Sequence, residues 1–178
     1  MPDTIALPPY AHVPGQNPRH AEDFMDAAKE LACAQTLDAN AADNVAWLHG
    51  LRLIDLEYYW EAHEILETVW MNAAPNSRER QLVQGIIHLA NAALKEKMDR
   101  PKAAARLLEL ARNHIDEAFI NHRGGDGGGG GNGGDCNGRD QRLMLVNYDK
   151  LQASLSLGHD RAALITNMHY NSLNCRNQ

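Results

Sequence analysis

Residues 58–70 have the sequence YYWEAHEILETVW, and residues 84–88 have the sequence QGIIH. In the first segment the apolar positions 58, 62, 65, 66 and 69 recur three and four residues apart, as on one face of an α-helix. The segment also carries one histidine and three glutamates, and the second segment adds a glutamine and a histidine. We therefore predict two neighbouring helices whose polar groups are able to converge on one place.

Helical geometry sorts these polar residues into separate faces. At about 100° per residue, His63 and Glu67 lie about 40° apart on one edge of the apolar face, and Glu64 lies about 60° beyond Glu67. Glu61 lies about 160° from His63 and points elsewhere. We therefore group the first three and expect Glu61, like Glu57, to be a surface carboxylate.

Alternatively, these carboxylates pair with Arg52 or Arg80. In the second segment, Gln84 and His88 belong to a narrow polar stripe on an otherwise apolar helix. Gly85 interrupts the same helix, and we expect it at a close helix crossing; Gly50 likewise predicts close packing.

Periodic apolar positions and turn signals extend the helical pattern in both directions. Asp43 or Asn44 suits an N-cap, residues 74–77 form a turn and cap, and Pro101 suits a first helical turn. No alternating strand pattern is present, so we predict an all-α compact bundle of about five amphipathic helices, the third and fourth antiparallel at its centre. The predicted helices cover residues 20–37, 44–55, 58–73, 78–98 and 102–120.

Composition divides the chain around this bundle. Five prolines fall within the first eighteen residues, so we expect residues 1–19 to be extended. Ten of the fifteen residues 124–138 are glycine, which predicts a flexible linker over residues 123–139. We expect a helical-bundle domain over residues 20–122 and a weakly helical or disordered tail over residues 140–178 that the core does not need.

Charge and cysteine content exclude several classes of function. A net charge of −6 and a pI near 5.8 oppose nucleic-acid binding, which requires clustered basic residues. No apolar run is long enough for a membrane helix, and no signal-peptide pattern is present, so we expect a cytoplasmic protein without a membrane partner. The three cysteines show no disulfide or zinc spacing, and Cys33 is expected to be a small apolar helix residue.

The polar residues of the two central helices allow three interpretations. They could form a hydrogen-bonded tether that fixes helix register, a pocket for a ligand or metal ion, or solvated faces that do not meet. The candidate metal ligands are His63, Glu67 and His88.

Two motifs carry a resemblance to a known family. E-A-H-E-x-L-E-x-x-W at residues 61–70, followed by Q-G-x-I at residues 84–87, resembles domain-of-unknown-function family 309, a family of small all-helical proteins. The resemblance covers about residues 47–118, and members often have Gln where this chain has His88. It implies a helical bundle and no established activity. The polar cluster that it implies consists of Glu61, His63, Glu64, Glu67, Trp70, Gln84 and Gly85.

Two functional hypotheses follow. In the first, the chain is a non-enzymatic binding or scaffold module that self-associates, and the cluster organises the bundle or receives a small molecule of unknown identity. In the second, it is a metal-dependent hydrolase-like enzyme, with a divalent ion on His63, Glu67 and His88 and with Glu64 as the base.

Overall fold

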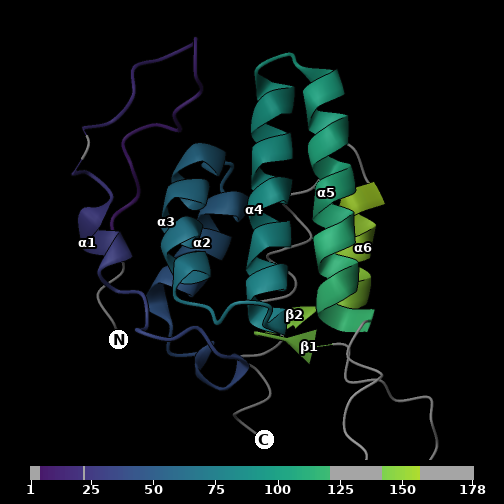
Figure 1. Ribbon diagram of the computed structural model, residues 1–178. Helices are drawn as coiled ribbons and strands as arrows, with labels where there is room; N and C mark the ends of the chain where they lie inside the picture. The colour runs from purple at the N-terminus through teal and green to yellow at the C-terminus, as the bar shows by residue number, and fades with distance from the viewer. Residues whose placement is uncertain (1–4, 22, 121–141, 157–178) are drawn as a thin grey trace, which may run out of the picture.

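The computed structural model describes residues 5–21, 23–120 and 142–156 of the chain. Helices dominate the described part, which also contains one short antiparallel hairpin (Figure 1). The all-α class predicted from the sequence is therefore confirmed. The elements are α1 (Asp26–Lys29), the 3-10 helix η1 (Asp38–Asn40), α2 (Val45–Asp55), α3 (Tyr59–Met71), α4 (Arg78–Lys97), α5 (Pro101–Ile120), β1 (Arg142–Leu143), β2 (Val146–Asn147) and α6 (Tyr148–Ser156).

Local hydrogen bonds set the helix bounds close to the predicted ones. The side chain of Asn44 accepts from the Trp47 amide at the start of α2, and that of Ser77 accepts from the Arg80 amide at the start of α4. At the end of α2, Glu57 has a φ of 64°, and the next amide donates to the Leu53 carbonyl at 2.8 Å. Such a left-handed residue after a helix satisfies its last carbonyls and turns the chain sharply.

Helices α2 to α5 follow one another through short turns, so neighbours in the sequence pack as neighbours in space (Figure 1). Helix α4 lies between α3 and α5. Both predicted close approaches are present. A Cβ at Gly50 would lie 2.5 Å from a Leu66 methyl group on α3, and one at Gly85 would lie 2.7 Å from Ile115 Cγ1 and 3.2 Å from the Ala111 carbonyl oxygen on α5.

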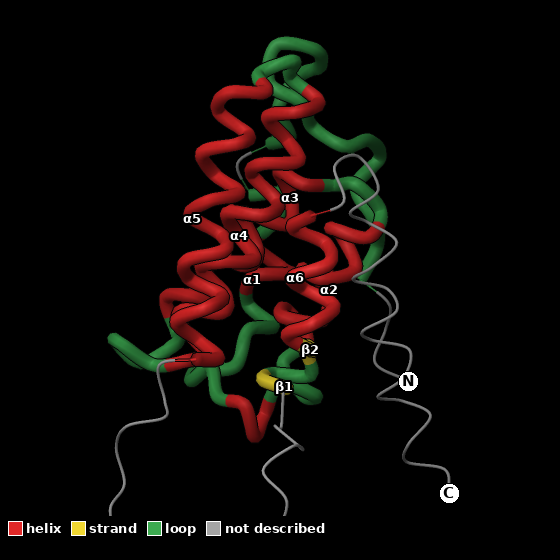
Figure 2. Tube along the Cα trace, turned by 90° about the vertical axis from the view of Figure 1, so that its right-hand side faces the viewer, coloured by secondary structure: helices red, strands yellow, loops and turns green. Residues whose placement is uncertain are grey.

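The hairpin and α6 enlarge the core beyond the expected boundary at residue 122. The indole N–H of Trp47 donates to the Met144 carbonyl at 3.1 Å, and Met144, in the hairpin turn, is fully buried. Leu151 of α6 is also fully buried in the same core. Figure 2 shows the hairpin at the lower end of the bundle. Residues 142–156 therefore pack into the core beyond the expected domain boundary, and the expectation that the core folds without them stays a prediction. The predicted Gly-rich linker lies outside the described residues.

The first predicted helix is much shorter than residues 20–37, and Cys33 is not helical. Phe24 and Leu31, two large apolar residues of this stretch, are 43% and 46% exposed. Beyond α1 the chain instead bonds to the end of α3: the Thr36 amide donates to the Asn72 carbonyl at 3.0 Å, and its hydroxyl donates to the Val69 carbonyl at 2.7 Å. These tertiary hydrogen bonds replace helical ones.

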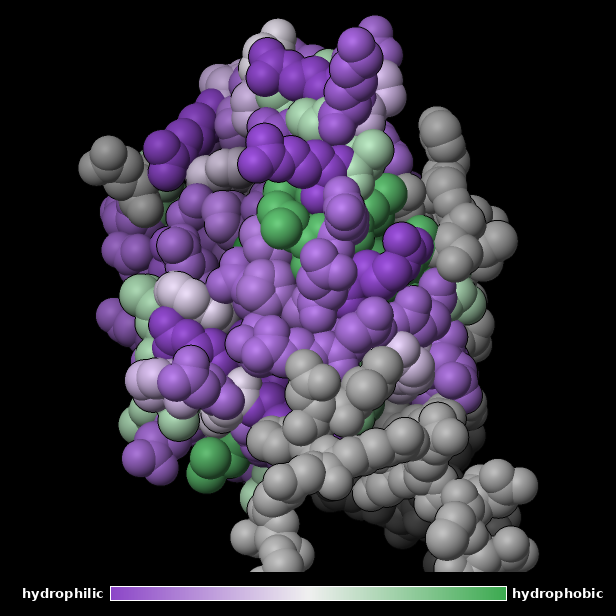
Figure 3. All heavy atoms as spheres, turned by 45° about the vertical axis from the view of Figure 1, so that its right-hand side comes forward, coloured by the Kyte–Doolittle hydropathy of each residue, from purple (hydrophilic) through white to green (hydrophobic). Residues whose placement is uncertain are grey.

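The outer surface is mostly polar where Figure 3 shows it, with a central hydrophobic area of limited extent and smaller hydrophobic spots elsewhere. The apolar helix faces are thus used mainly inside the bundle. Within the described ranges, no helix has both the length and the apolar character needed to cross a membrane.

Candidate functional site

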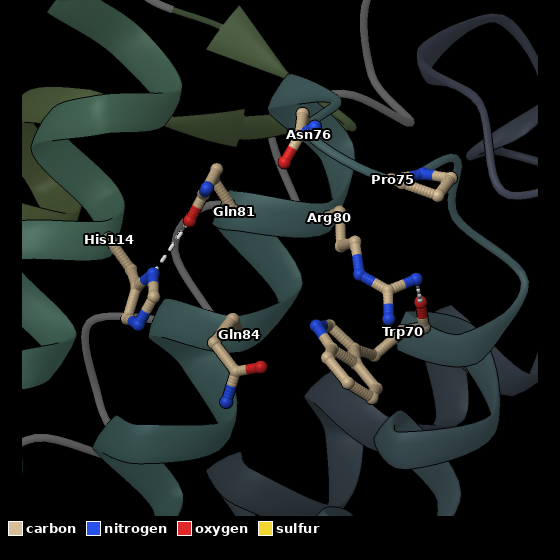
Figure 4. Close-up of a pocket in the computed structure, with 7 residues that line it drawn as sticks. All are labelled: Trp70, Pro75, Asn76, Arg80, Gln81, Gln84 and His114. Carbon is tan, nitrogen blue, oxygen red and sulfur yellow. Dashed lines mark hydrogen bonds between the residues drawn. The ribbon is translucent and has the colours of Figure 1, made fainter.

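A pocket of about 210 Å³ lies where the end of α3, the α3–α4 turn, α4 and α5 meet (Figure 4). Ser77 caps α4 directly after this turn, and the polar stripe of α4 therefore begins at the pocket. The residues that line it are Trp70, Pro75, Asn76, Arg80, Gln81, Gln84 and His114.

Arg80 is held firmly on one side of the pocket. Its Cζ lies 3.8 Å from the centroid of the Trp70 ring, a cation–π contact. Its Nη1 donates to the carbonyls of Trp70 at 3.1 Å and Ala73 at 2.8 Å, which lie at the end of α3. Its Nε and Nη2 have no hydrogen-bond partner among the residues that the structure describes. One edge of the guanidinium therefore fixes its position and the other remains available as a donor pair.

Gln81 and His114 form the opposite wall. The Nδ1 of His114 lies 2.6 Å from the Gln81 side-chain oxygen, so Nδ1–H donates to it. Burial lowers the pKa of His114, and the nearby Glu117 carboxylate only partly opposes this effect. The imidazole is therefore neutral near pH 7 and adds no charge to the pocket.

His88 continues this wall away from the pocket. The Nε2 of Gln84 lies 3.2 Å from the Nε2 of His88, and the rings of His88 and His114 stack with centroids 5.3 Å apart. Burial, together with His114 and His63, lowers the pKa of His88. Its Nδ1 is buried and has no partner within the described part of the chain. Polar groups of α3, α4 and α5 thus meet, as predicted for the first two of these helices.

Other members of the predicted cluster lie apart from the pocket. Glu64 forms an ion pair with Lys29 at 3.2 Å, and Glu67 is exposed. Gly85 packs against α5 rather than facing the pocket. In residues 5–21, 23–120 and 142–156, no group of three or more His, Cys, Asp or Glu is arranged to hold a metal ion. His63, Glu67 and His88 are therefore not brought together as the predicted metal site.

The prediction that Glu61 is a surface carboxylate is wrong. Its side chain is fully buried, and its Oε1 accepts from the His12 amide at 2.7 Å and from His20 Nε2 at 2.8 Å. His20 stacks between Tyr10 and Phe24. The N-terminal segment therefore lies across this face of α3 and is anchored there. Glu57 is exposed as predicted, but its partner is Lys97, at 2.6 Å.

Comparison with known proteins finds similarity in the same central helices. Residues 47–107 match the sequence model of a family described as a domain of unknown function, DUF309. This central third of the chain is thus similar to DUF309. No significant match was found among curated proteins or among solved structures. The DUF309 match includes most of α2, all of α3 and α4 and the start of α5, and therefore every pocket residue except His114.

Neither Arg80 nor His114 was predicted as a site residue. Arg80 was expected to pair with Glu57 or Glu61, but it contacts Trp70 and Ala73 instead.

His114 lies outside the DUF309 match, but it directly precedes the buried Ile115 and follows the buried Ala111 by three positions. A histidine beside the apolar stripe of a helix was the available signal. His12 and His20 had no comparable signal, because they lie in a segment without helical periodicity.

Proposed function

We propose that this protein is a non-enzymatic binding module whose pocket takes a small molecule bearing a carboxylate or phosphate group. The observation that carries the proposal is the fixed guanidinium of Arg80, whose second donor edge has no partner among the described residues and lies at the pocket. Paired N–H groups in this fixed geometry match two oxygens of a carboxylate or phosphate.

The charge of the lining favours an anion. Arg80 is the only charged side chain among the lining residues, because His114 is neutral. The chain as a whole carries a net charge of −6, so the pocket is locally different from the rest of the protein. A single cation with no carboxylate among the lining residues is best matched by one anionic group.

The size of the pocket limits the ligand. Its volume of about 210 Å³ is below the roughly 300–1,000 Å³ typical of sites for drug-sized molecules. A small organic acid or phosphate therefore fits better than a nucleotide or a peptide.

We also propose that the protein acts in the cytoplasm. Its acidic composition and the spacing of its cysteines, which shows no disulfide pattern, support this location.

The hydrolase-like alternative has no supporting observation in the described residues. Its expected base, Glu64, is paired with Lys29, and its expected metal ligands are not grouped. We therefore do not advance it.

The proposal is tested by titrating the protein with sodium propionate and with inorganic phosphate while recording two-dimensional NMR spectra. We expect millimolar dissociation constants and shifts of the Trp70 indole signal. Arg80→Gln should weaken binding about tenfold or more, the effect of losing charge-assisted hydrogen bonds.

Arg78→Gln is the matched control, because Arg78 lies in the same turn of α4 and donates to the Ala118 carbonyl without lining the pocket. Equal effects of the two substitutions, or no saturable binding by either anion, would contradict the proposal. Arg80→Lys keeps the charge but not the paired donors, so intermediate binding is expected.

A further inference from the structure

We infer that the ligand of this pocket is a small hydroxy acid, in which the acid group binds Arg80 and a neutral hydroxyl group binds Gln84. The inference rests on the proposed function and specifies the chemical class that the site selects. It comes from the distribution of donors and acceptors across the pocket.

The two walls of the pocket offer opposite hydrogen-bonding groups. On one side, the Nε and Nη2 of Arg80 are donors without a partner among the described residues. In Figure 4 they face the side of the pocket where Gln84 lies. A ligand between the walls meets donors at one end.

Gln84 supplies the acceptor at the other end. Its Nε2 is directed to His88 Nε2 at 3.2 Å, which leaves the side-chain oxygen for another partner. In Figure 4 this oxygen points toward Trp70 and Arg80, and the nitrogen points away from them. An amide oxygen accepts a hydrogen bond from a ligand O–H or N–H group.

The charge of the lining residues decides whether the second group of the ligand is a hydroxyl or an ammonium group. No Asp or Glu is among the seven lining residues. An ammonium group held at Gln84 would lose hydration without gaining a counterion, whereas a hydroxyl group needs only one acceptor. The site therefore favours a hydroxy acid over the corresponding amino acid.

Three probes that differ in one substituent test this inference: propionate, lactate (2-hydroxypropionate) and alanine (2-aminopropionate). Isothermal titration or NMR should show lactate binding about fivefold or more tighter than propionate, the effect of one added hydrogen bond. Alanine should bind more weakly than lactate. For a phosphate ligand, the affinity of glycerol 3-phosphate is compared with that of inorganic phosphate. Comparing the carboxylate pair with the phosphate pair shows which acid group the site prefers.

Gln84→Leu should abolish the lactate-to-propionate preference. Asn91→Leu is the control, because Asn91 is a half-buried residue of the same helix that does not line the pocket, and it should keep the preference. If both anions bind through Arg80 with equal affinity, or if Gln84→Leu keeps the preference, the hydroxy-acid inference is wrong and the proposed function stands. If neither binds in an Arg80-dependent manner, both are overturned.

Discussion

Helix α3 supports two polar regions that differ in how deeply they are buried. At its first turn, Glu61 is fully buried; its Oε1 accepts from two donors of the N-terminal segment, and its Oε2 has no partner among the described residues. At its last turn, Trp70 contacts Arg80 of α4 beside an open pocket. Both residues are half-buried, and one guanidinium edge has no partner among the described residues. Both regions combine charge with aromatic rings. The deeply buried first region therefore stabilises the fold, whereas the half-buried second region remains accessible to a ligand.

The largest expected effect breaks the first region. Glu61→Ala removes the acceptor shared by the His12 amide and His20, and both donors lose their partner in a buried place. The free energy of unfolding should fall by about 3 kcal/mol, measured by chemical denaturation.

Glu67→Ala, on the exposed side of the same helix, is the control and should change stability by about 0.5 kcal/mol or less. Equal effects of the two substitutions would mean that Glu61 does not anchor the N-terminal segment.

The next-largest effect concerns the helix packing beside the second region and not its binding groups. Gly85 follows Gln84 but faces α5, where an added Cβ would meet Ile115 and the Ala111 carbonyl. Gly85→Leu should cost about 2 kcal/mol through overpacking, measured as a lower denaturation midpoint. Ala105→Leu, an exposed position on α5, should be nearly neutral. An unchanged midpoint for Gly85→Leu would show that the α4–α5 contact is looser than described.

A pH titration of stability should detect the histidines beside the pocket. The pKa values of His88 and His114 are lowered by burial from the ordinary value of 6.5. As the pH falls below 6.5, the unfolded chain therefore binds protons before the folded chain does, and stability falls. The melting temperature should be highest above pH 6.5 and drop as the pH is lowered toward 5.

The double variant His88→Gln and His114→Gln should lose part of this pH dependence, because its unfolded state no longer gains two protons that the folded state resists. An unchanged slope of melting temperature against pH would assign the effect to other groups, among which His49 also has a pKa lowered by burial.

The smallest expected effect on stability comes from the residue most important for binding. Arg80→Gln removes a cation–π contact and two hydrogen bonds to carbonyls at a half-buried site. We expect a loss of about 1 kcal/mol in the free energy of unfolding, measured by denaturation without added anion. A loss as large as that of Glu61→Ala would contradict the comparison, because the two regions would then be equally structural.

Much of the helical framework was predictable because its signals are local. Asn44, Ser77 and Pro101 lie at or next to the first residues of three helices, and the apolar periodicity of residues 58–70 predicted α3. Such signals act within one or two helical turns, so no knowledge of distant residues is needed. The candidate site was only partly predictable, because Gln84 and Trp70 were expected but Arg80 and His114 were not.

The sequence by itself determined the helical class, most helix bounds and the presence of polar residues on α3 and α4. Tertiary structure decided which of those residues meet. Helical angles placed Glu61 away from His63, but only the folded chain brings His12 and His20 onto Glu61 and buries it. Similarly, Gly85 signalled a close crossing, but only the fold assigns it to α5. Apolar periodicity indicates which face of a helix is buried. Which element packs against that face depends on contacts between residues far apart in the sequence.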